Sequence, residues 1–147
     1  MGEDTGGSGR GPASYCGVVG LRPTFTRVGR FGMTHMCWFM DAAAPMTKTV
    51  EDCAVMLGVI AGYDEKDPYT SHKPVPDYTA KMRDGVKGLR VGLIKELHQA
   101  PDIHPDVRAA IESSLETFRQ LGAEIKEVSI PLAELAGAIF VGVADTW

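Results

Sequence analysis

The stretch "LRVGLIKELHQAPDIHPDVRAAIESSLETFRQLGAEIKEVSIP", residues 89–131, decides the fold class of this sequence. Residues 89–96 are compact and apolar, which predicts a buried strand, and residues 123–131 alternate apolar and polar side chains as a second strand does. Between them, Pro105 marks the start of a helix and Gly122 its end. The apolar positions of that helix repeat at helical spacing (Val107, Ile111, Leu115, Phe118 and Leu121). A strand, a helix and a strand in this order normally form a parallel pair, so the sequence predicts an α/β protein.

A second helix is predicted over residues 50–60, within "TKTVEDCAVMLGVIAG". Thr49 has the side chain of a helix N-cap, and Asp52 follows three residues later. The apolar side chains of Cys53, Met56, Leu57 and Ile60 recur on one face before Gly62. This helix is therefore expected to bury one face.

The other segments give weaker patterns. Val18–Leu21 predicts a short buried strand or a tight connection, and residues 25–40 resemble irregular loop more than helix. Residues 63–86 contain several prolines and many polar side chains, which predicts an exposed excursion with a short helical turn near residues 78–83. Residues 132–147 are expected to form a helix that ends at Trp147 without a cap.

Composition excludes several classes of function. The chain has 147 residues, 44% hydrophobic and 23% charged, with a formal net charge of −4. No basic face is expected to bind nucleic acid directly, and no apolar run approaches the roughly 20 residues that span a bilayer. The cysteines and histidines are scattered, without the spacing of a metal site or a disulfide framework. The sequence thus predicts a cytoplasmic protein with no cofactor and no metal.

The glycine-rich opening, residues 2–13, has three mechanical interpretations. A flexible linker fits poorly, because charged residues and a proline interrupt the glycines. A phosphate cradle also fits poorly, since Ser8 stands where the P-loop lysine would be. The third interpretation is a nucleophile loop, in which backbone N–H groups of Thr5, Gly6, Gly7 and Ser8 converge on an oxyanion beside the Ser8 hydroxyl. Asp4 and Arg10 flank this loop and are expected to pair and brace it.

Two blocks of the chain resemble the amidase signature family. "GEDTGGSGRGPASYCGVVGLRPT", residues 2–24, is similar to GxDTGGSxRxPAxxCGxxGxKPT, and "MDAAAPMTKTVEDCAVMLGVIAGYDEKD", residues 40–67, is similar to LDxxGPMTRTVEDAAxxLxxIAGxDxxD. The resemblance is strong through Asp67 and weak beyond it. It implies part of an α/β/α fold with a mixed sheet flanked by helices.

The resemblance also implies a chemistry, namely acyl transfer from an amide. Ser8 matches the acylating serine of the family, and Thr5, Gly6 and Gly7 match, with Ser8, its oxyanion hole. The family uses a lysine that acts through a second serine to take and return the proton.

That lysine and the bridging serine lie upstream of the acylating serine in the family, and only seven residues precede Ser8 here. Residues 1–147 are therefore expected to be a partial amidase-signature domain, lacking the N-terminal part with the base and the C-terminal part, and to be inactive alone. Glu3 also replaces a residue that is usually small in the family, which adds a carboxyl group beside the loop.

Three functions stay open. The first is an amidase that hydrolyses a carboxamide of a small molecule through an acyl-enzyme on Ser8. The second is the glutaminase (A) subunit of a tRNA-dependent amidotransferase, and the third is a truncated homologue without activity. Where strands are missing, an exposed sheet edge predicts a homodimer or another association, and no contact with a membrane is expected.

Overall fold

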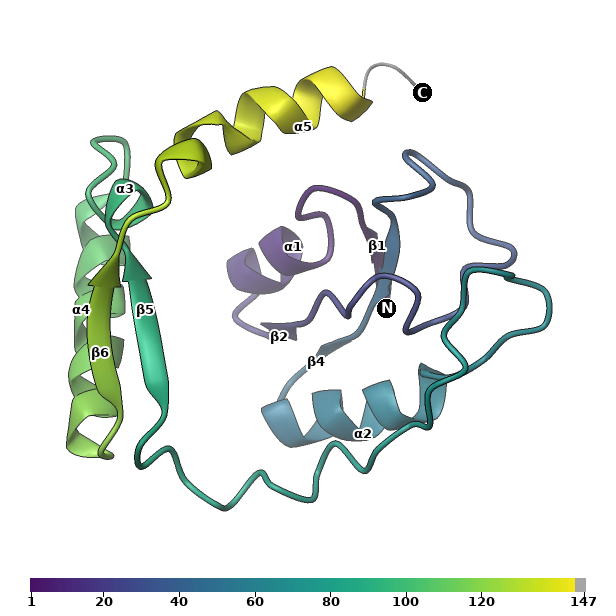
Figure 1. Cartoon of the computed structure of the whole chain (residues 1–147), viewed down its shortest axis with the longest axis horizontal. Coiled ribbons are helices and arrows are strands. Elements are labelled where there is room, and N and C mark those ends of the chain that lie inside the picture. Colours follow the sequence, from purple (N-terminus) through teal and green to yellow (C-terminus); the bar gives the residue numbers. More distant parts are fainter. Residues whose placement is uncertain (145–147) are drawn as a thin grey trace. The chain divides into compact units, whose positions relative to one another are not determined.

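The computed structural model describes residues 1–144. They divide into two compact units, the first with residues 1–83 and Ala144 and the second with residues 84–143. Each unit has helices and a few short strands, which confirms the predicted α/β class (Figure 1).

The first unit contains two antiparallel strand pairs. Strand β1 (Gly2–Asp4) pairs with β3 (Ala42–Ala44), with Asp4 opposite Ala42. Strand β2 (Val19–Gly20) pairs with β4 (Met46–Thr47), and this pair lies between α1 (Arg10–Tyr15) and α2 (Val50–Ile60) (Figure 1). The β1–β3 pair matters most for the site, because it places the residues after Asp4 beside a segment almost forty positions further along the chain.

A small apolar core holds the first unit together. Val28, Ala43 and Leu57 are its buried members, from a loop, β3 and α2 respectively. All three alanines of β3 are buried. Because their side chains are single methyl groups, β1 and the loop that follows it can approach β3 closely. An added Cβ on Gly9 would lie 2.6 Å from the Cβ of Ala44, which shows how tight this approach is.

Helix α2 begins as the sequence predicts. The hydroxyl of Thr49 accepts a hydrogen bond from the N–H of Asp52 at 3.0 Å, and Cys53 and Leu57 face the interior. Of the four apolar positions predicted for its inner face, Met56 and Ile60 are only partly buried.

The second unit is built on the predicted strand, helix and strand. Strand β5 (Arg90–Ile94) and strand β6 (Glu124–Val128) are parallel, with Val91 opposite Ile125. Helix α4 (Pro105–Gln120) covers one face of this pair, and a short helix α3 (Lys95–His98) follows β5 (Figure 1).

Other predictions need correction. Residues 10–15 form helix α1 and residues 2–4 and 42–44 form strands, none of which the sequence indicated. The excursion of residues 63–86 is not exposed throughout, because Asp67 and Thr70 are buried. Asp67 is held by the guanidinium of Arg30, which is itself buried, at 3.2 Å. The segment near residues 78–83 makes turns and no helix.

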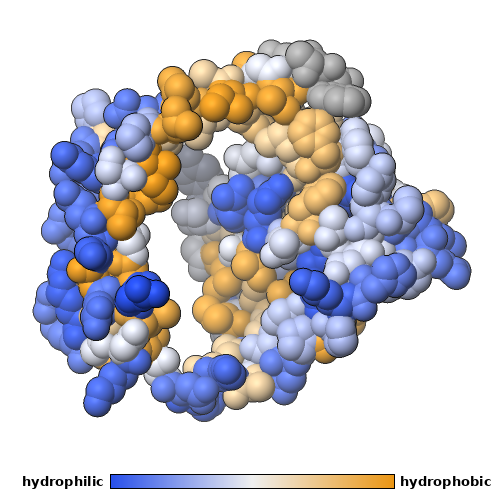
Figure 2. All heavy atoms as spheres, in the orientation of Figure 1, coloured by the Kyte–Doolittle hydropathy of each residue, from blue (hydrophilic) through white to orange (hydrophobic). Residues whose placement is uncertain are grey.

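The C-terminal helix is shorter than predicted. A 3-10 turn spans Pro131–Leu135, and α5 spans Ala136–Ala144. The predicted end at Trp147 lies outside the described residues. Figure 2 shows hydrophobic side chains gathered over α5, where Ile139 and Val141 are exposed. Leu132 and Leu135 of the preceding 3-10 turn are exposed as well. None of the helices in residues 1–144 combines the length and the apolar character that crossing a membrane requires.

Candidate functional site

The candidate site is the turn that connects β1 to α1, residues 5–9. Gly7 has a φ of +133°, in the left-handed region that side chains rarely adopt, and Gly9 leaves no room for a side chain against Ala44. Glycine at these two positions is therefore required by the backbone path.

The carboxylate of Asp4 fixes the shape of the loop through hydrogen bonds. This carboxylate is fully buried and accepts hydrogen bonds from the N–H groups of Gly7 at 2.9 Å, Arg10 at 3.1 Å and Gly9 at 3.3 Å. The guanidinium of Arg10 adds two more, from Nε at 2.9 Å and Nη2 at 3.0 Å. Asp4 and Arg10 thus pair as the sequence predicts, in the two-pronged geometry that an arginine and a carboxylate favour.

Burial alone would raise the pKa of Asp4. The hydrogen bonds and the positive charge of Arg10, together with the N–H of Gly9, outweigh this and lower the pKa to about 2. Asp4 is therefore ionised at neutral pH, and its negative charge keeps several backbone donors turned inward.

Arg22 ties the start of the loop to the segment before β3. Its Nε donates to the carbonyl oxygen of Asp4 at 3.3 Å, and its Nη2 donates to the carbonyl oxygen of Met40. This guanidinium lies 3.6 Å from the Asp4 carboxylate and so adds to the positive charge around it.

Asp41 holds the loop from the opposite side. It is fully buried, and it accepts a hydrogen bond of 2.6 Å from the hydroxyl of Thr5. The N–H groups of Met36 and Cys37 and the Nδ1 atom of His35 also contact its carboxylate, at 3.0 to 3.2 Å. These donors outweigh the effect of burial and lower the pKa of Asp41.

Four of the six predicted site residues, Thr5 to Ser8, lie in this turn. The other two flank it, with Asp4 at the end of β1 and Arg10 at the start of α1. Ser8 is exposed, and neither its hydroxyl nor its N–H forms a hydrogen bond within residues 1–144. The same holds for the N–H of Gly6. The N–H of Gly7, by contrast, is directed at Asp4.

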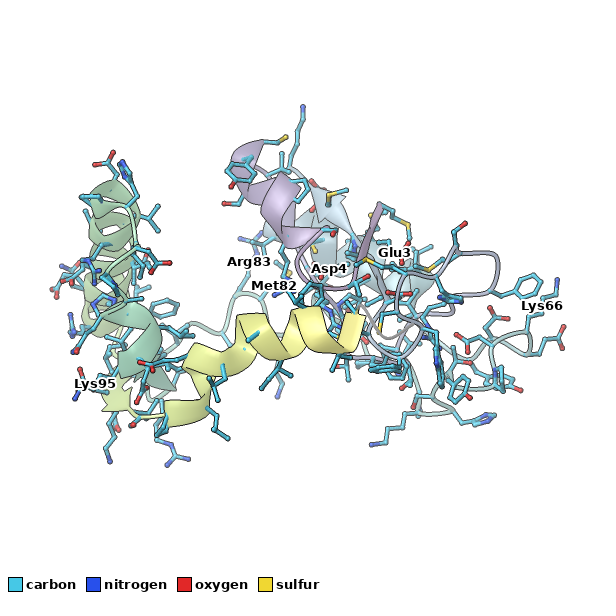
Figure 3. The ribbon with its side chains drawn as sticks, turned by 90° about the horizontal axis from the view of Figure 1, so that it is seen from above. Glu3, Asp4, Lys66, Met82, Arg83 and Lys95 are labelled. Carbon is cyan, nitrogen blue, oxygen red and sulfur yellow. The ribbon has the colours of Figure 1, made fainter. Side chains whose placement is uncertain are left out.

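The lysines do not take part in this arrangement. Within the described part of the chain, no lysine side chain hydrogen-bonds the loop. Figure 3 shows Lys66 at the periphery of the first unit, away from Asp4, and its Nζ lies 5.1 Å from the centre of the Phe31 ring.

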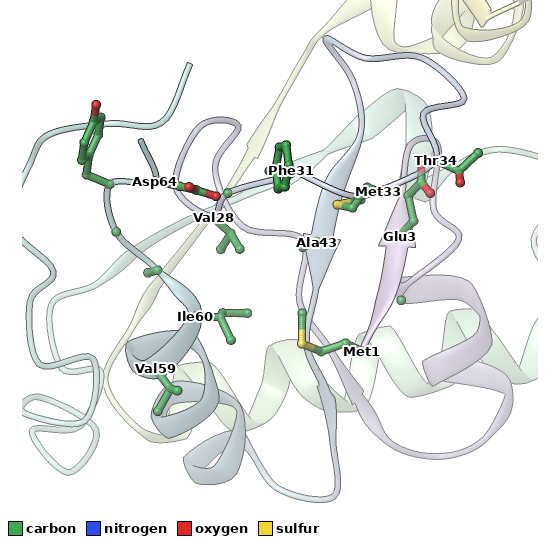
Figure 4. A pocket seen from close by; sticks show the side chains of 15 residues that line it. Met1, Glu3, Val28, Phe31, Met33, Thr34, Ala43, Val59, Ile60 and Asp64 are labelled. Atoms are coloured by element: carbon green, nitrogen blue, oxygen red, sulfur yellow. The ribbon is translucent and has the colours of Figure 1, made fainter. Parts of the chain in front are cut away.

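A hollow of about 640 Å³ lies beside β1, on the side of Glu3 (Figure 4). Its lining includes both apolar side chains, such as those of Val28 and Ile60, and the polar side chains of Glu3, Thr34 and Asp64. Ser8 is not part of it. The hollow is therefore separate from the candidate nucleophile.

Comparison with known proteins decides the family. A model of the Amidase family matches residues 1–146. The chain belongs to the amidase family. Members of the amidase family with solved structures share its fold: the (A) subunit of glutamyl-tRNA(Gln) amidotransferase from Thermotoga maritima matches 99% of this chain and 32% of that protein, with a TM-score of 0.89 and 35% identity.

Two further relatives in the amidase family carry names that differ from each other. The (A) subunit of glutamyl-tRNA(Gln) amidotransferase from Pelobacter propionicus is 45% identical over 98% of this chain and 30% of its own length. The native peptide amidase of Stenotrophomonas maltophilia is 34% identical, with a TM-score of 0.81, over 95% of this chain and 29% of that protein. The chain thus spans about 30% of the length of the curated relatives it matches.

Sequence reasoning missed two residues that shape the loop, Arg22 and Asp41. Both lie inside the blocks that resemble the family, so the signal was available. Their roles depend on contacts across 18 and 36 positions of the chain, however, which no local pattern reveals.

Proposed function

We propose that this chain supplies the acylating serine and the oxyanion loop of an amide-cleaving enzyme, with Ser8 as the nucleophile. The observation that supports this most directly is that some backbone N–H groups of the loop hydrogen-bond Asp4 and others do not. Asp4 holds the N–H groups of Gly7, Gly9 and Arg10 inward, while those of Gly6 and Ser8 stay available next to an exposed hydroxyl. A loop whose shape is maintained by internal hydrogen bonds can hold an oxyanion without reorganising.

In this proposal the Oγ of Ser8 attacks the carbonyl carbon of a carboxamide and forms a tetrahedral intermediate. The carbonyl oxygen becomes the oxyanion and accepts hydrogen bonds from the N–H groups of Gly6 and Ser8. The proton of the Ser8 hydroxyl passes to the base and from it to the nitrogen, the carbon–nitrogen bond breaks, and ammonia leaves. Water then hydrolyses the acyl-enzyme, which releases the carboxylic acid and restores the Ser8 hydroxyl. Thr5 acts here through its hydroxyl, which anchors the loop at Asp41, and Arg10 acts by holding Asp4.

The proton acceptor belongs to another part of the enzyme in this proposal. We propose that residues 1–147 are one part of an amidase-signature domain, and that the lysine and bridging serine lie in a part that precedes it. The chain's match to about 30% of each relative's length agrees with this division. Without the base, the loop and the serine alone retain a fraction of the rate enhancement.

A covalent probe tests the role of Ser8. When the chain is mixed with the separately expressed remaining parts of the Pelobacter relative, a fluorophosphonate that carries a dye is expected to label the chain at Ser8, as located by peptide mass spectrometry. Ser8→Ala should abolish this labelling. Ser14→Ala is the matched control, because Ser14 is an exposed serine on α1, and it should be labelled like the natural chain. Equal labelling of the Ser8→Ala chain would contradict the proposal.

The relatives favour one amide in particular. The Thermotoga and Pelobacter proteins both carry the name of a glutamyl-tRNA(Gln) amidotransferase, so we propose glutamine as the amide donor and a role as its glutaminase (A) subunit. The peptide amidase match keeps a peptide amide as the competing substrate.

Complementation separates the two substrates. The chain would be mixed with the separately expressed remaining parts of the Pelobacter relative, and ammonia release would be followed with glutamine or with a peptide amide. Faster release from glutamine supports the glutaminase role, and faster release from the peptide amide contradicts it. No release from either supports the third alternative, a homologue without activity.

A further inference from the structure

Glu3 lies on the same face of the β1–β3 pair as Thr5 and Asp41. Asp4 is opposite Ala42 and side chains alternate along a strand, and the Thr5 hydroxyl donates to Asp41 at 2.6 Å on this face. Glu3 is the middle residue of β1, and its neighbour Asp4 points into the loop, so the two side chains leave the strand on opposite sides. Figure 3 shows both side chains close to the loop, and Figure 4 shows Glu3 at the hollow beside β1.

Asp41 has enough donors to keep its charge. Its two oxygens accept from the Thr5 hydroxyl, from the N–H groups of Met36 and Cys37, and from His35. A buried carboxylate with this many donors is stabilised in its ionised form.

Glu3 has far fewer. Its Oε1 atom is buried and has no hydrogen-bond partner within residues 1–144. Burial, and next the negative charge of Asp41, raise the pKa of Glu3, while the N–H of Met36 and the charge of His35 act in the opposite sense. Asp41 is fully buried and Glu3 is partly buried, and each of two adjacent carboxylates makes ionisation of the other less favourable. The pKa of the one with fewer donors is therefore raised.

We propose that Glu3 and Asp41 form a carboxyl pair that carries one proton, held on Glu3, and that this pair positions Thr5 and through it the Thr5–Ser8 loop. The protonated oxygen of Glu3 donates to Asp41, and Asp41 accepts from Thr5 in turn. The titratable groups that face Glu3 are Asp41 and His35 from the segment before β3, and Met1 and Asp64 line the same hollow. The effect on the loop rests on the proposed function, but the carboxyl pair does not.

The direction of the pH dependence follows from the sign of the shift. Because the pKa of Glu3 in the folded chain lies above its ordinary value, the pair stabilises the chain fully below that ordinary value. This stabilisation is lost as the pH rises through the folded pKa of Glu3. Ionised Glu3 then repels Asp41, and the anchor of Thr5 weakens.

A titration of the full chain by carbon-detected NMR tests the pair. In the natural chain the side-chain carboxyl carbon of Glu3 is expected to titrate above the range of an exposed glutamate. In Asp41→Asn this pKa should fall back to the ordinary range, and in Glu51→Gln, a change at an exposed glutamate of α2, it should stay raised. An ordinary pKa of Glu3 in the natural chain, or a raised one that Asp41→Asn does not lower, would overturn the proposal.

The Glu3→Gln chain supplies a second test that holds if Asp41→Asn does not fold. Its unfolding midpoint in urea should lack the decline with rising pH that the natural chain shows, and an unchanged decline would overturn the pair. The rate at which the fluorophosphonate labels Ser8 should lose the same pH step in Glu3→Gln, and a retained step would overturn the link to the loop. If the probe labels no variant of the chain even in the mixture with the remaining parts of the relative, the proposed function fails, while the NMR titration still decides the pair.

Discussion

At the scale of single residues, two buried aspartates shape this site from opposite sides. Asp4 gathers the backbone donors of the second half of the loop, and Asp41 fixes the hydroxyl of Thr5 at its start. Gly7 connects the two halves with a backbone conformation that other residues adopt only under strain. The position of Ser8 thus depends on two carboxylates that never contact its hydroxyl.

Replacing Asp4 tests how much its carboxylate stabilises the folded chain. Asp4→Asn should lower the free energy of unfolding at neutral pH by about 2 kcal/mol, because the ionised form gains Arg10 and the backbone donors only in the folded chain. Since the pKa of Asp4 is lowered to about 2, this contribution is present above its ordinary value and is lost as the pH falls toward about 2.

Urea unfolding at a series of pH values measures both effects. The Asp4→Asn chain lacks the contribution of the carboxylate at every pH, and the natural chain should lose it only in acid. The two curves of unfolding free energy against pH should therefore approach each other as the pH falls. Asp84→Asn, a change at an exposed aspartate, is the control and should alter stability by no more than about 0.5 kcal/mol. Parallel curves for the natural chain and Asp4→Asn would show that Asp4 is not the titrating group.

At the scale of elements, local signals predicted α2, α4, β5 and β6, and they failed for β1, β3 and α1. The successful elements carry their own start and stop residues and at least five positions of pattern. Strands β1 and β3 have three residues each, too few for an alternation, and α1 has six, with a glycine and a proline among them. Strands β1 and β3 are stabilised by pairing with each other, and α1 is stabilised by packing against β2, more than by their own propensity.

The cap of α2 offers a test at this scale. Thr49→Ala removes the hydroxyl that accepts from the N–H of Asp52, and it should lower the free energy of unfolding by about 1 kcal/mol. Thermal unfolding followed by circular dichroism measures the change. Ser114→Ala, in the interior of α4, removes an exposed hydroxyl without touching a cap and should be close to neutral. If both variants melt alike, the cap does not contribute.

At the scale of the whole molecule, large apolar side chains are exposed on and near the C-terminal helix α5. This helix has no buried residue. Such surfaces are covered by another chain or by the rest of a larger fold. The match to about 30% of each relative's length is consistent with the second explanation.

We therefore predict that the chain associates with itself in solution. Size-exclusion chromatography with light scattering should give a dimer or larger species, and Ile139→Glu should raise the monomer fraction because it places a charge on the apolar face of α5. Glu134→Gln changes an exposed residue in the preceding turn without adding charge to that face, and it should leave the distribution unchanged. A monomeric natural chain would contradict this prediction.

The sequence by itself determined the α/β class, the parallel β5–β6 pair with its helix, the cap of α2 and the pairing of Asp4 with Arg10. In each case the physical cause lies within a few positions or in a regular repeat: a capping side chain, an apolar period, or two opposite charges at the ends of one short loop. Only the tertiary structure decided that Asp41 and Arg22 hold the loop, that the N–H of Gly7 is turned toward Asp4, and that Glu3 lies on the same face of the β1–β3 pair as a buried carboxylate. Those arrangements depend on β1 and β3 lying side by side, and the packing that joins them brings together residues whose separation along the chain hides their contact.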